Sequence, residues 1–140
     1  SLSAYGVGFH RHNSEIDQEL KKISKNTEFS FTPHLSPMFR GILSSIYVNI
    51  SDNMSPKKIY NFLKKIYKKD QFINFAKFNR PISTNDVINS NNCLISVCKS
   101  KYNNKIVIFS AIDNLIKGGS GQGVQNMNII CNFPESRGLI

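Results

Sequence analysis

Two runs of apolar residues in the second half of the chain constrain the fold most strongly. Leu, Ile and Val recur in residues 94–100 and 105–112, and a short segment that contains Tyr102-Asn103-Asn104 separates the two runs. This pattern predicts an antiparallel β-hairpin. Residues 41–50 have the same composition and predict a further strand, and residues 71–75 predict a short one.

Apolar residues that recur every three or four positions predict two helices. The first covers residues 13–24, with Asn13 or Ser14 as its N-terminal cap. The second follows the Ser-Pro pair at residues 55–56, which is typical of a helix start, and continues to residue 69.

Three further segments complete the expected arrangement. Apolar and polar residues alternate in residues 28–32, which predicts a strand before a proline-bounded loop. The glycine-rich residues 118–123 are expected to lead into a helix, and residues 134–140 to form a tail. The apolar side of that last helix carries Val124, Met127 and Ile130.

Strands mixed with helices, together with antiparallel pairing, predict an α+β fold. We expect a mixed, largely antiparallel sheet with helices packed on one face. A chain of 140 residues with 40% hydrophobic content has enough apolar material for the core of one domain.

The net charge of the chain is strongly positive. Eighteen basic and nine acidic residues give a formal charge of +9, which attracts phosphates, nucleotides or nucleic acid. Several of the lysines lie between residues 57 and 69, on the second predicted helix. A solvated helix face is favoured over a binding patch, because phosphate-binding surfaces commonly use arginine and interleaved aromatic residues.

The sequence also bears on compartment and metal binding. There is no run of eighteen apolar residues and the first six residues lack a secretory pattern, so we expect no membrane span and a cytoplasmic location. Cys93, Cys98 and Cys131 have no metal-type spacing, and their odd number suits a reducing compartment. We therefore expect neither a disulfide nor a metal site.

Ionisable side chains are concentrated before the first predicted helix. His10, Arg11, His12 and Glu15 fall within six positions. Histidine suits proton transfer near neutral pH, arginine suits a phosphate, and the free N–H groups of a helix start favour an anion. The same residues also fit an ordinary polar helix cap on the surface.

Arg40 and the glycine-rich run are two further candidates. Prolines stiffen the loop before Arg40, which is either directed at an anion or a solvated residue of a strand connection. The glycines of residues 118–123 allow a nucleotide to approach the backbone closely, or form a flexible turn before a helix. Their spacing matches neither a dinucleotide fingerprint nor a P-loop.

Four segments together resemble one enzyme family, in the same order along the chain. They read GFHRHNSEIDQEL, FSFTPHLSPMFRGILSSIYV, SNNCLISV and AIDNLIKGGSGQGVQNMN. These segments look like the C-terminal half of the N-acetyl-gamma-glutamyl-phosphate reductases, and the resemblance covers residues 4–139. The HRH and VQNMN blocks are specific, whereas the proline loop has a looser counterpart in the aspartate-semialdehyde dehydrogenases. The fold implied is the glyceraldehyde-3-phosphate dehydrogenase-like C-terminal domain.

The resemblance implies a reductive step of arginine biosynthesis. N-acetylglutamyl 5-phosphate is converted into N-acetylglutamate 5-semialdehyde and phosphate through a cysteine thioester, and NADPH delivers the hydride. It further implies a small acyl phosphate as substrate, NADP as cofactor and a homo-oligomer, either dimer or tetramer. Neither nucleic acid nor a membrane is implied as a partner.

The resemblance also implies roles for particular residues. His10 would be the acid/base partner of the nucleophilic cysteine. The substrate-binding residues implied are Arg11, His12, Glu15 and Arg40. The residues implied to border the nicotinamide are Asn114, Lys117, Gly118, Gly121 and Gln122. No metal is implied.

The chain departs from the family pattern in instructive places. It contains neither a dinucleotide fingerprint nor the glycine-cysteine turn of the nucleophile, and Cys93 matches a structural cysteine at a strand start. We therefore expect the nucleotide-binding half to precede Ser1 and the chain alone to be inactive. Residues 1–112 would form the substrate and subunit-contact domain, and residues 113–140 would return toward the nucleotide-binding half.

Three substitutions relative to the family affect helices. Ser14 stands where the family usually has proline, and Gly119 and Gly123 stand where it often has alanine. Each glycine is expected to weaken the last helix by about 1 kcal/mol. Two alternative functions stay open: a basic binding module for nucleic acid, and a purely structural subunit-contact domain.

Overall fold

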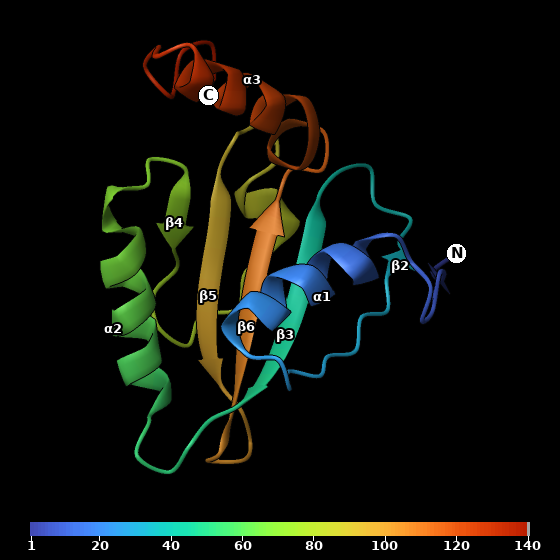
Figure 1. Ribbon diagram of the computed structural model, residues 1–140, viewed down its shortest axis with the longest axis vertical. Helices are drawn as coiled ribbons and strands as arrows, with labels where there is room; N and C mark the ends of the chain where they lie inside the picture. Colours follow the sequence, from blue (N-terminus) through green and yellow to red (C-terminus); the bar gives the residue numbers. More distant parts are fainter. Residues whose placement is uncertain (140) are drawn as a thin grey trace. The chain divides into compact units, whose positions relative to one another are not determined.

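A computed structural model describes residues 1–139 and is shown in Figure 1. The chain falls into two compact units, Ser1–Phe39 and Arg40–Ile140. The boundary expected from the sequence, between residues 112 and 113, lies inside the second unit. The return of residues 113–140 toward a nucleotide-binding domain stays a prediction, and Ile140 lies outside the described residues.

The first unit contains one helix and a very short sheet. Strand β1 (Ser3–Ala4) pairs antiparallel with β2 (His34–Leu35), and α1 (His12–Ile23) lies between them in sequence. The predicted strand at residues 28–32 is wrong, because that segment finds no partner strand and only residues 34–35 pair. Alternation alone does not supply hydrogen-bonding partners.

The start of α1 also differs from the prediction. Arg11 occupies the N-cap position and makes no side-chain cap hydrogen bond, whereas Asn13 and Ser14 lie inside the helix. The backbone N–H of Asn13 donates to the carbonyl of His10 at 2.8 Å, so a preceding turn already leads into the helix. The Ser14 hydroxyl donates instead to the Arg11 carbonyl at 2.9 Å.

The second unit is built on a four-stranded sheet of order β3-β6-β5-β4. The hairpin is confirmed: β5 (Cys93–Lys99) pairs antiparallel with β6 (Lys105–Ile112), and β3 (Ile42–Asn49) pairs antiparallel with β6. The short strand β4 (Ile73–Phe75) is parallel to β5. The mixed, largely antiparallel sheet expected from the sequence is therefore present.

Helix α2 (Pro56–Ile66) covers the β4–β5 side of one sheet face, as Figure 1 shows. Its predicted start is confirmed, because the Ser55 side chain accepts a hydrogen bond from the backbone N–H of Lys58. A 3-10 helix, η1 (Tyr67–Lys69), extends it. Tyr60 of α2 packs on Val97 and Ile106 in the sheet, and these three residues form the core cluster. The Tyr60 hydroxyl donates to the carbonyl of Ala76 at 3.1 Å.

The loop between β4 and β5 contains a short 3-10 helix, η2 (Thr84–Asp86). After β6 the chain forms a wide helical turn, η3 (Ile116–Ser120), and then α3 (Gly121–Ile130), which lies beyond the end of β6 in Figure 1. Gly119 has non-helical backbone angles within η3. The expected loss of about 1 kcal/mol of helix propensity thus applies to Gly123, inside α3, and not to Gly119.

The buried residues of α3 are not its apolar ones. Its buried residues are Gly121, Gln125 and Asn128, whereas Met127 and Ile130 are 49% and 79% exposed. The polar side chains are buried because they are hydrogen-bonded. Asn128 donates to the carbonyls of Glu135 and Arg137, so the predicted tail is docked on α3 through the described residues.

Among residues 1–139, no helix combines the length and apolar character needed to cross a membrane. In the same residues, no group of three or more His, Cys, Asp or Glu side chains is placed to hold a metal ion. The three cysteines are unpaired.

Candidate functional site

His10 is held in the turn that precedes α1. Its ring meets the rings of Tyr5 and Phe31 edge-on, with centroid distances of 5.3 and 5.6 Å. Nδ1 of His10 accepts a hydrogen bond from the backbone N–H of His12 at 3.3 Å. A nitrogen that accepts a hydrogen bond carries no hydrogen, so in this arrangement the single proton of the neutral ring is on Nε2.

Gly6 makes this turn possible. Its φ of 57° lies in the left-handed region, and its carbonyl accepts the backbone N–H groups of Phe9 and His10 at 3.2 and 2.9 Å. A Cβ at Gly6 would stand 3.1 Å from both Cβ and Cδ2 of His10. The residue at position 6 thus determines where the imidazole lies.

The other ionisable residues of this cluster are exposed at the start of α1. The His12 ring centroid lies 4.8 Å from that of His10, and Glu15 is in the first helical turn. Arg11 and Glu15 are four positions apart and His12 and Glu15 three apart, so the helix presents them to one side. The structure therefore gathers all four predicted residues of this unit around one turn.

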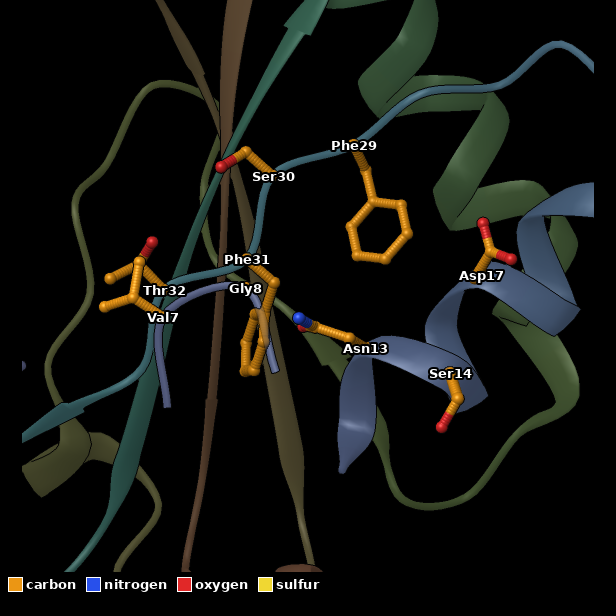
Figure 2. Close-up of a pocket in the computed structure, with 9 residues that line it drawn as sticks. All are labelled: Val7, Gly8, Asn13, Ser14, Asp17, Phe29, Ser30, Phe31 and Thr32. Atoms are coloured by element: carbon orange, nitrogen blue, oxygen red, sulfur yellow. The ribbon is translucent and has the colours of Figure 1, made fainter. Parts of the chain in front are cut away.

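A hollow of about 480 Å³ lies on this unit and does not coincide with the cluster. It is lined by Val7, Gly8, Asn13, Ser14, Asp17, Phe29, Ser30, Phe31 and Thr32. Figure 2 shows the Asn13 side chain directed from the start of α1 toward Phe31. Its Oδ1 is buried without a hydrogen-bond partner within the described chain. None of the predicted residues His10, Arg11, His12 and Glu15 lines the hollow.

In the second unit, Asp113 connects three segments at the end of β6. The side chain is fully buried and accepts hydrogen bonds from the backbone N–H groups of Asn89, Leu115 and Ile116 at 2.8 to 2.9 Å. Nη1 of Arg40 lies 3.4 Å from its Oδ1. Burial alone would raise the pKa of Asp113, but the three N–H donors and the guanidinium hold that pKa below its ordinary value.

The predicted cofactor residues meet Arg40 at this point. The Asn114 side chain accepts the backbone N–H of Gly41 at 2.7 Å, and the N–H of Gly118 donates to the Asp113 carbonyl at 2.8 Å. Arg40 is therefore paired with the Asp113 carboxylate, Gly118 is bound to the Asp113 backbone carbonyl, and Asn114 is bound to Gly41, the residue after Arg40. The sequence could not identify Asp113, because periodicity does not distinguish a buried acid that follows a strand from a surface turn residue.

The remaining predicted cofactor residues occupy different environments. Gly121 is buried, and a Cβ there would stand 2.6 Å from Cγ2 of Ile116 and still closer to Oδ1 of Asn91. The half-buried Gln122 donates to Asn126 at 2.8 Å. Nζ of Lys117 donates to Oε1 of Gln125 at 2.6 Å. Gly121 thus serves packing, while Lys117 and Gln122 are accessible.

The chain is similar to known semialdehyde dehydrogenases and reductases. Residues 1–114 match the family model described as semialdehyde dehydrogenase, dimerisation domain. The N-acetyl-gamma-glutamyl-phosphate reductase of Clostridium kluyveri is 42% identical over 140 residues, which are 99% of this chain and 41% of that protein. The reductase of the same name from Afipia carboxidovorans is 44% identical over 137 residues, 97% of this chain and 39% of that protein.

Among solved structures, aspartate semialdehyde dehydrogenase II from Vibrio cholerae, complexed with ASA, has a TM-score of 0.66 at 17% sequence identity. The match covers 89% of this chain and 38% of that one. At this identity the likeness supports the fold alone, and it agrees with the predicted α+β class. The chain spans about two fifths of the length of the curated relatives it matches.

Proposed function

The chain belongs to the semialdehyde dehydrogenase family, and from this membership we propose that it is the substrate-binding part of an NADPH-dependent N-acetyl-gamma-glutamyl-phosphate reductase. The observation that carries the proposal is the similarity of almost the whole chain to reductases of that name. The reaction would convert N-acetylglutamyl 5-phosphate into the 5-semialdehyde and phosphate, within arginine biosynthesis.

His10 is the proposed acid/base residue. Nε2 is the nitrogen proposed to exchange a proton with the cysteine nucleophile. To accept that proton it must first be free of hydrogen, which requires the ring proton to move to Nδ1 and the 3.3 Å hydrogen bond from the His12 N–H to be given up. The rings of Tyr5 and Phe31 restrict the imidazole to one orientation. No cysteine of this chain lies in the first unit, so the nucleophile would come from outside it.

Arg11, His12, Glu15 and Arg40 are the proposed substrate-binding residues. The acyl phosphate carries phosphate and carboxylate groups, and a guanidinium binds either through parallel hydrogen bonds. The Asp113 carboxylate orients Arg40, with Oδ1 at 3.4 Å from Nη1. Three backbone N–H groups favour the ionised form of that carboxylate. Convergence of Arg40 with the His10 cluster on one substrate stays a prediction.

The residues of the glycine-rich turn fit a pyridine nucleotide. The exposed Gly118 and Gly119 have no side chains to obstruct it, Lys117 supplies an ammonium group and Gln122 an amide. NADPH, when bound, supplies the hydride for the reduction. Lys117 would contact one of its anionic groups, and Asn114 would keep the turn close to Gly41.

Two exposed apolar surfaces support further contacts. All residues of the edge strand β3 are exposed, among them Ile42, Leu43, Ile46 and Tyr47, and this strand would form the interface of a homodimer. On α3, Met127, Ile129 and Ile130 are exposed and would pack against a nucleotide-binding domain. Because free cysteines suit a reducing compartment, we also propose a cytoplasmic location.

The dimer proposal is tested by Ile46→Lys, analysed by sedimentation with Phe62→Lys on α2 as the matched control. Ile46 and Phe62 are both exposed apolar residues, at 45% and 59%. We expect Ile46→Lys to dissociate the dimer and Phe62→Lys to leave it intact. Equal behaviour of the two variants would argue against β3 as the interface.

The reaction is tested with the protein as its gene encodes it, by following NADPH oxidation. We expect turnover with N-acetylglutamyl phosphate and much less with aspartyl phosphate. The 140-residue chain alone should be inactive, since it has no dinucleotide fingerprint. Preference for aspartyl phosphate, or NADPH oxidation by the chain alone, would contradict the proposal.

Nucleic-acid binding is the second candidate, and one observation favours it. The lysines of α2 and η1 form no ion pair within residues 1–139, so their charge is not neutralised by the described chain. Such binding would weaken steeply between low and physiological salt. Absence of RNA and DNA binding at low salt would eliminate this candidate.

A further inference from the structure

The Gln125 side chain lies between a cation and an anion in the second unit. Its Oε1 accepts hydrogen bonds from Nζ of Lys117 at 2.6 Å and from Nδ2 of Asn91 at 2.9 Å. Its Nε2 donates to Oε1 of Glu135 at 2.6 Å. Gln125 and Asn91 are 8% and 0% exposed, so the amide is locked with its oxygen toward Lys117.

This arrangement orients Lys117 without neutralising it. Within residues 1–139, Lys117 and Glu135 form no direct ion pair, because the neutral Gln125 amide separates them. The ammonium group also lies 5.4 Å from the centre of the Phe72 ring, which is likewise neutral. Its positive charge therefore remains available to an anionic ligand.

The charged and titratable groups that face Lys117 come from two segments. Burial holds the pKa of Lys117 below its ordinary value, and Cys93 on β5 and the Glu135 carboxylate offset this only in part. Glu135 therefore favours the charged form of Lys117 through space, without a direct ion pair.

The segment that carries Glu135 is itself fixed. Nδ2 of Asn128, on a side chain that is 1% exposed, donates to the carbonyls of Glu135 and Arg137 at 3.0 and 2.9 Å. The backbone N–H of Phe133 donates to the Asn128 carbonyl at 2.8 Å. The carboxylate is thus held in place by α3.

We propose that Gln125 and Glu135 are positioning residues that hold the Lys117 ammonium group at the nucleotide site, so that the segment after α3 is part of that site. The inference rests on the proposed function, under which Lys117 contacts an anionic group of NADPH. Neither Gln125 nor Glu135 would touch the cofactor; each acts through Lys117.

The test exchanges the two side chains. The variant Gln125→Glu/Glu135→Gln has the same composition and net charge as the wild type, and it can keep all three hydrogen bonds around position 125. It places a carboxylate directly on Lys117, however, and so neutralises the ammonium group. The control is the exchange Gln18→Glu/Glu19→Gln on α1, where both side chains are exposed.

The readout is the KM for NADPH of the protein as its gene encodes it, with the urea midpoint as a check on folding. We expect the exchange at 125 and 135 to raise this KM by about tenfold or more, the effect of losing a contact with a charged group, with little change in kcat. The control exchange should change neither. An unchanged KM in a folded variant would overturn the inference.

A second variant covers the case in which the exchange does not fold. Glu135→Gln removes only the negative charge, so the pKa of Lys117 should fall. The KM for NADPH rises when Lys117 loses its proton, and in this variant the rise should begin at a lower pH. A purely structural role predicts an unshifted profile and would overturn the inference. NMR titration of the same variants without cofactor measures the pKa of Lys117 directly, and so the effect of residues 125 and 135 on it. A wild-type protein with no NADPH-dependent activity would overturn the proposed function and this inference with it.

Discussion

Gly121 and Gly123 offer a matched pair of substitutions two residues apart on α3. A Cβ at Gly121 would stand 2.6 Å from Cγ2 and 2.7 Å from the carbonyl oxygen of Ile116, and still closer to Oδ1 of Asn91. A Cβ at Gly123 would meet no atom within 4 Å. Both residues have negative φ, so alanine is compatible with the backbone at each position.

The expected effects have opposite signs. Gly121→Ala pushes Ile116 and Asn91 away from position 121, and overpacking of this kind costs about 1 to 3 kcal/mol. Helix propensity offsets little of this cost, because Gly121 is the first residue of α3. The net loss should be about 2 kcal/mol. Gly123→Ala has only the propensity term and should stabilise the second unit by about 1 kcal/mol.

Urea denaturation of the two variants, followed by circular dichroism, measures this difference. We expect a lower urea midpoint for Gly121→Ala and a higher one for Gly123→Ala than for the wild type. Wild-type stability of Gly121→Ala would refute the close approach of α3 to Asn91, on which the location of Gln125 also depends.

Three single-residue features can be tested separately: the Asp113 carboxylate, the Ser55 cap and the exposure of the cysteines. Asp113→Asn should destabilise the second unit by about 3 kcal/mol at neutral pH, since an amide nitrogen would face the Asn89 N–H or another donor. The Asp113 carboxylate stabilises the folded protein only while it is ionised, and its pKa in the folded protein is below the ordinary aspartate value of about 3.9. The difference in urea midpoint between wild type and Asp113→Asn should therefore shrink as the pH falls from about 3.9 through that lower pKa. Ser55→Ala should cost about 1 kcal/mol by removing the cap on the Lys58 N–H, measured by thermal unfolding. Iodoacetamide followed by mass spectrometry should modify the exposed Cys131 in the native protein and the buried Cys98 only after unfolding.

The parts of the fold predicted from sequence are those fixed by local signals. The hairpin of β5 and β6 and the capped start of α2 depend on residues adjacent in sequence, and both are confirmed. The parallel pairing of β4 with β5 joins segments almost twenty residues apart, and no local pattern specifies it.

The burial of polar residues on α3 could not be predicted from the sequence. Met127 and Ile130 are exposed, whereas Gln125 and Asn128 are buried because Lys117, Asn91 and the residues after α3 satisfy their amides. Periodicity counts apolar side chains and cannot recognise that a polar one will find its partners.

The candidate site was predicted unevenly for the same reason. Residue chemistry and the family resemblance indicated His10, Arg40 and Lys117, and the structure gives each a defined set of contacts. Asp113, Gln125 and Glu135, which hold two of them, were not predicted, because their roles depend on contacts across the fold. Since His10 and Arg40 belong to different compact units, their action on one substrate stays a prediction.

Under the proposed function, His10 transfers a proton in the reduction of an acyl phosphate. The most direct test is the steady-state turnover of N-acetylglutamyl phosphate by His10→Gln, in the protein as its gene encodes it. We expect a fall in kcat of about a hundredfold or more with the urea midpoint preserved. Turnover near the wild-type rate in a correctly folded His10→Gln variant would contradict it.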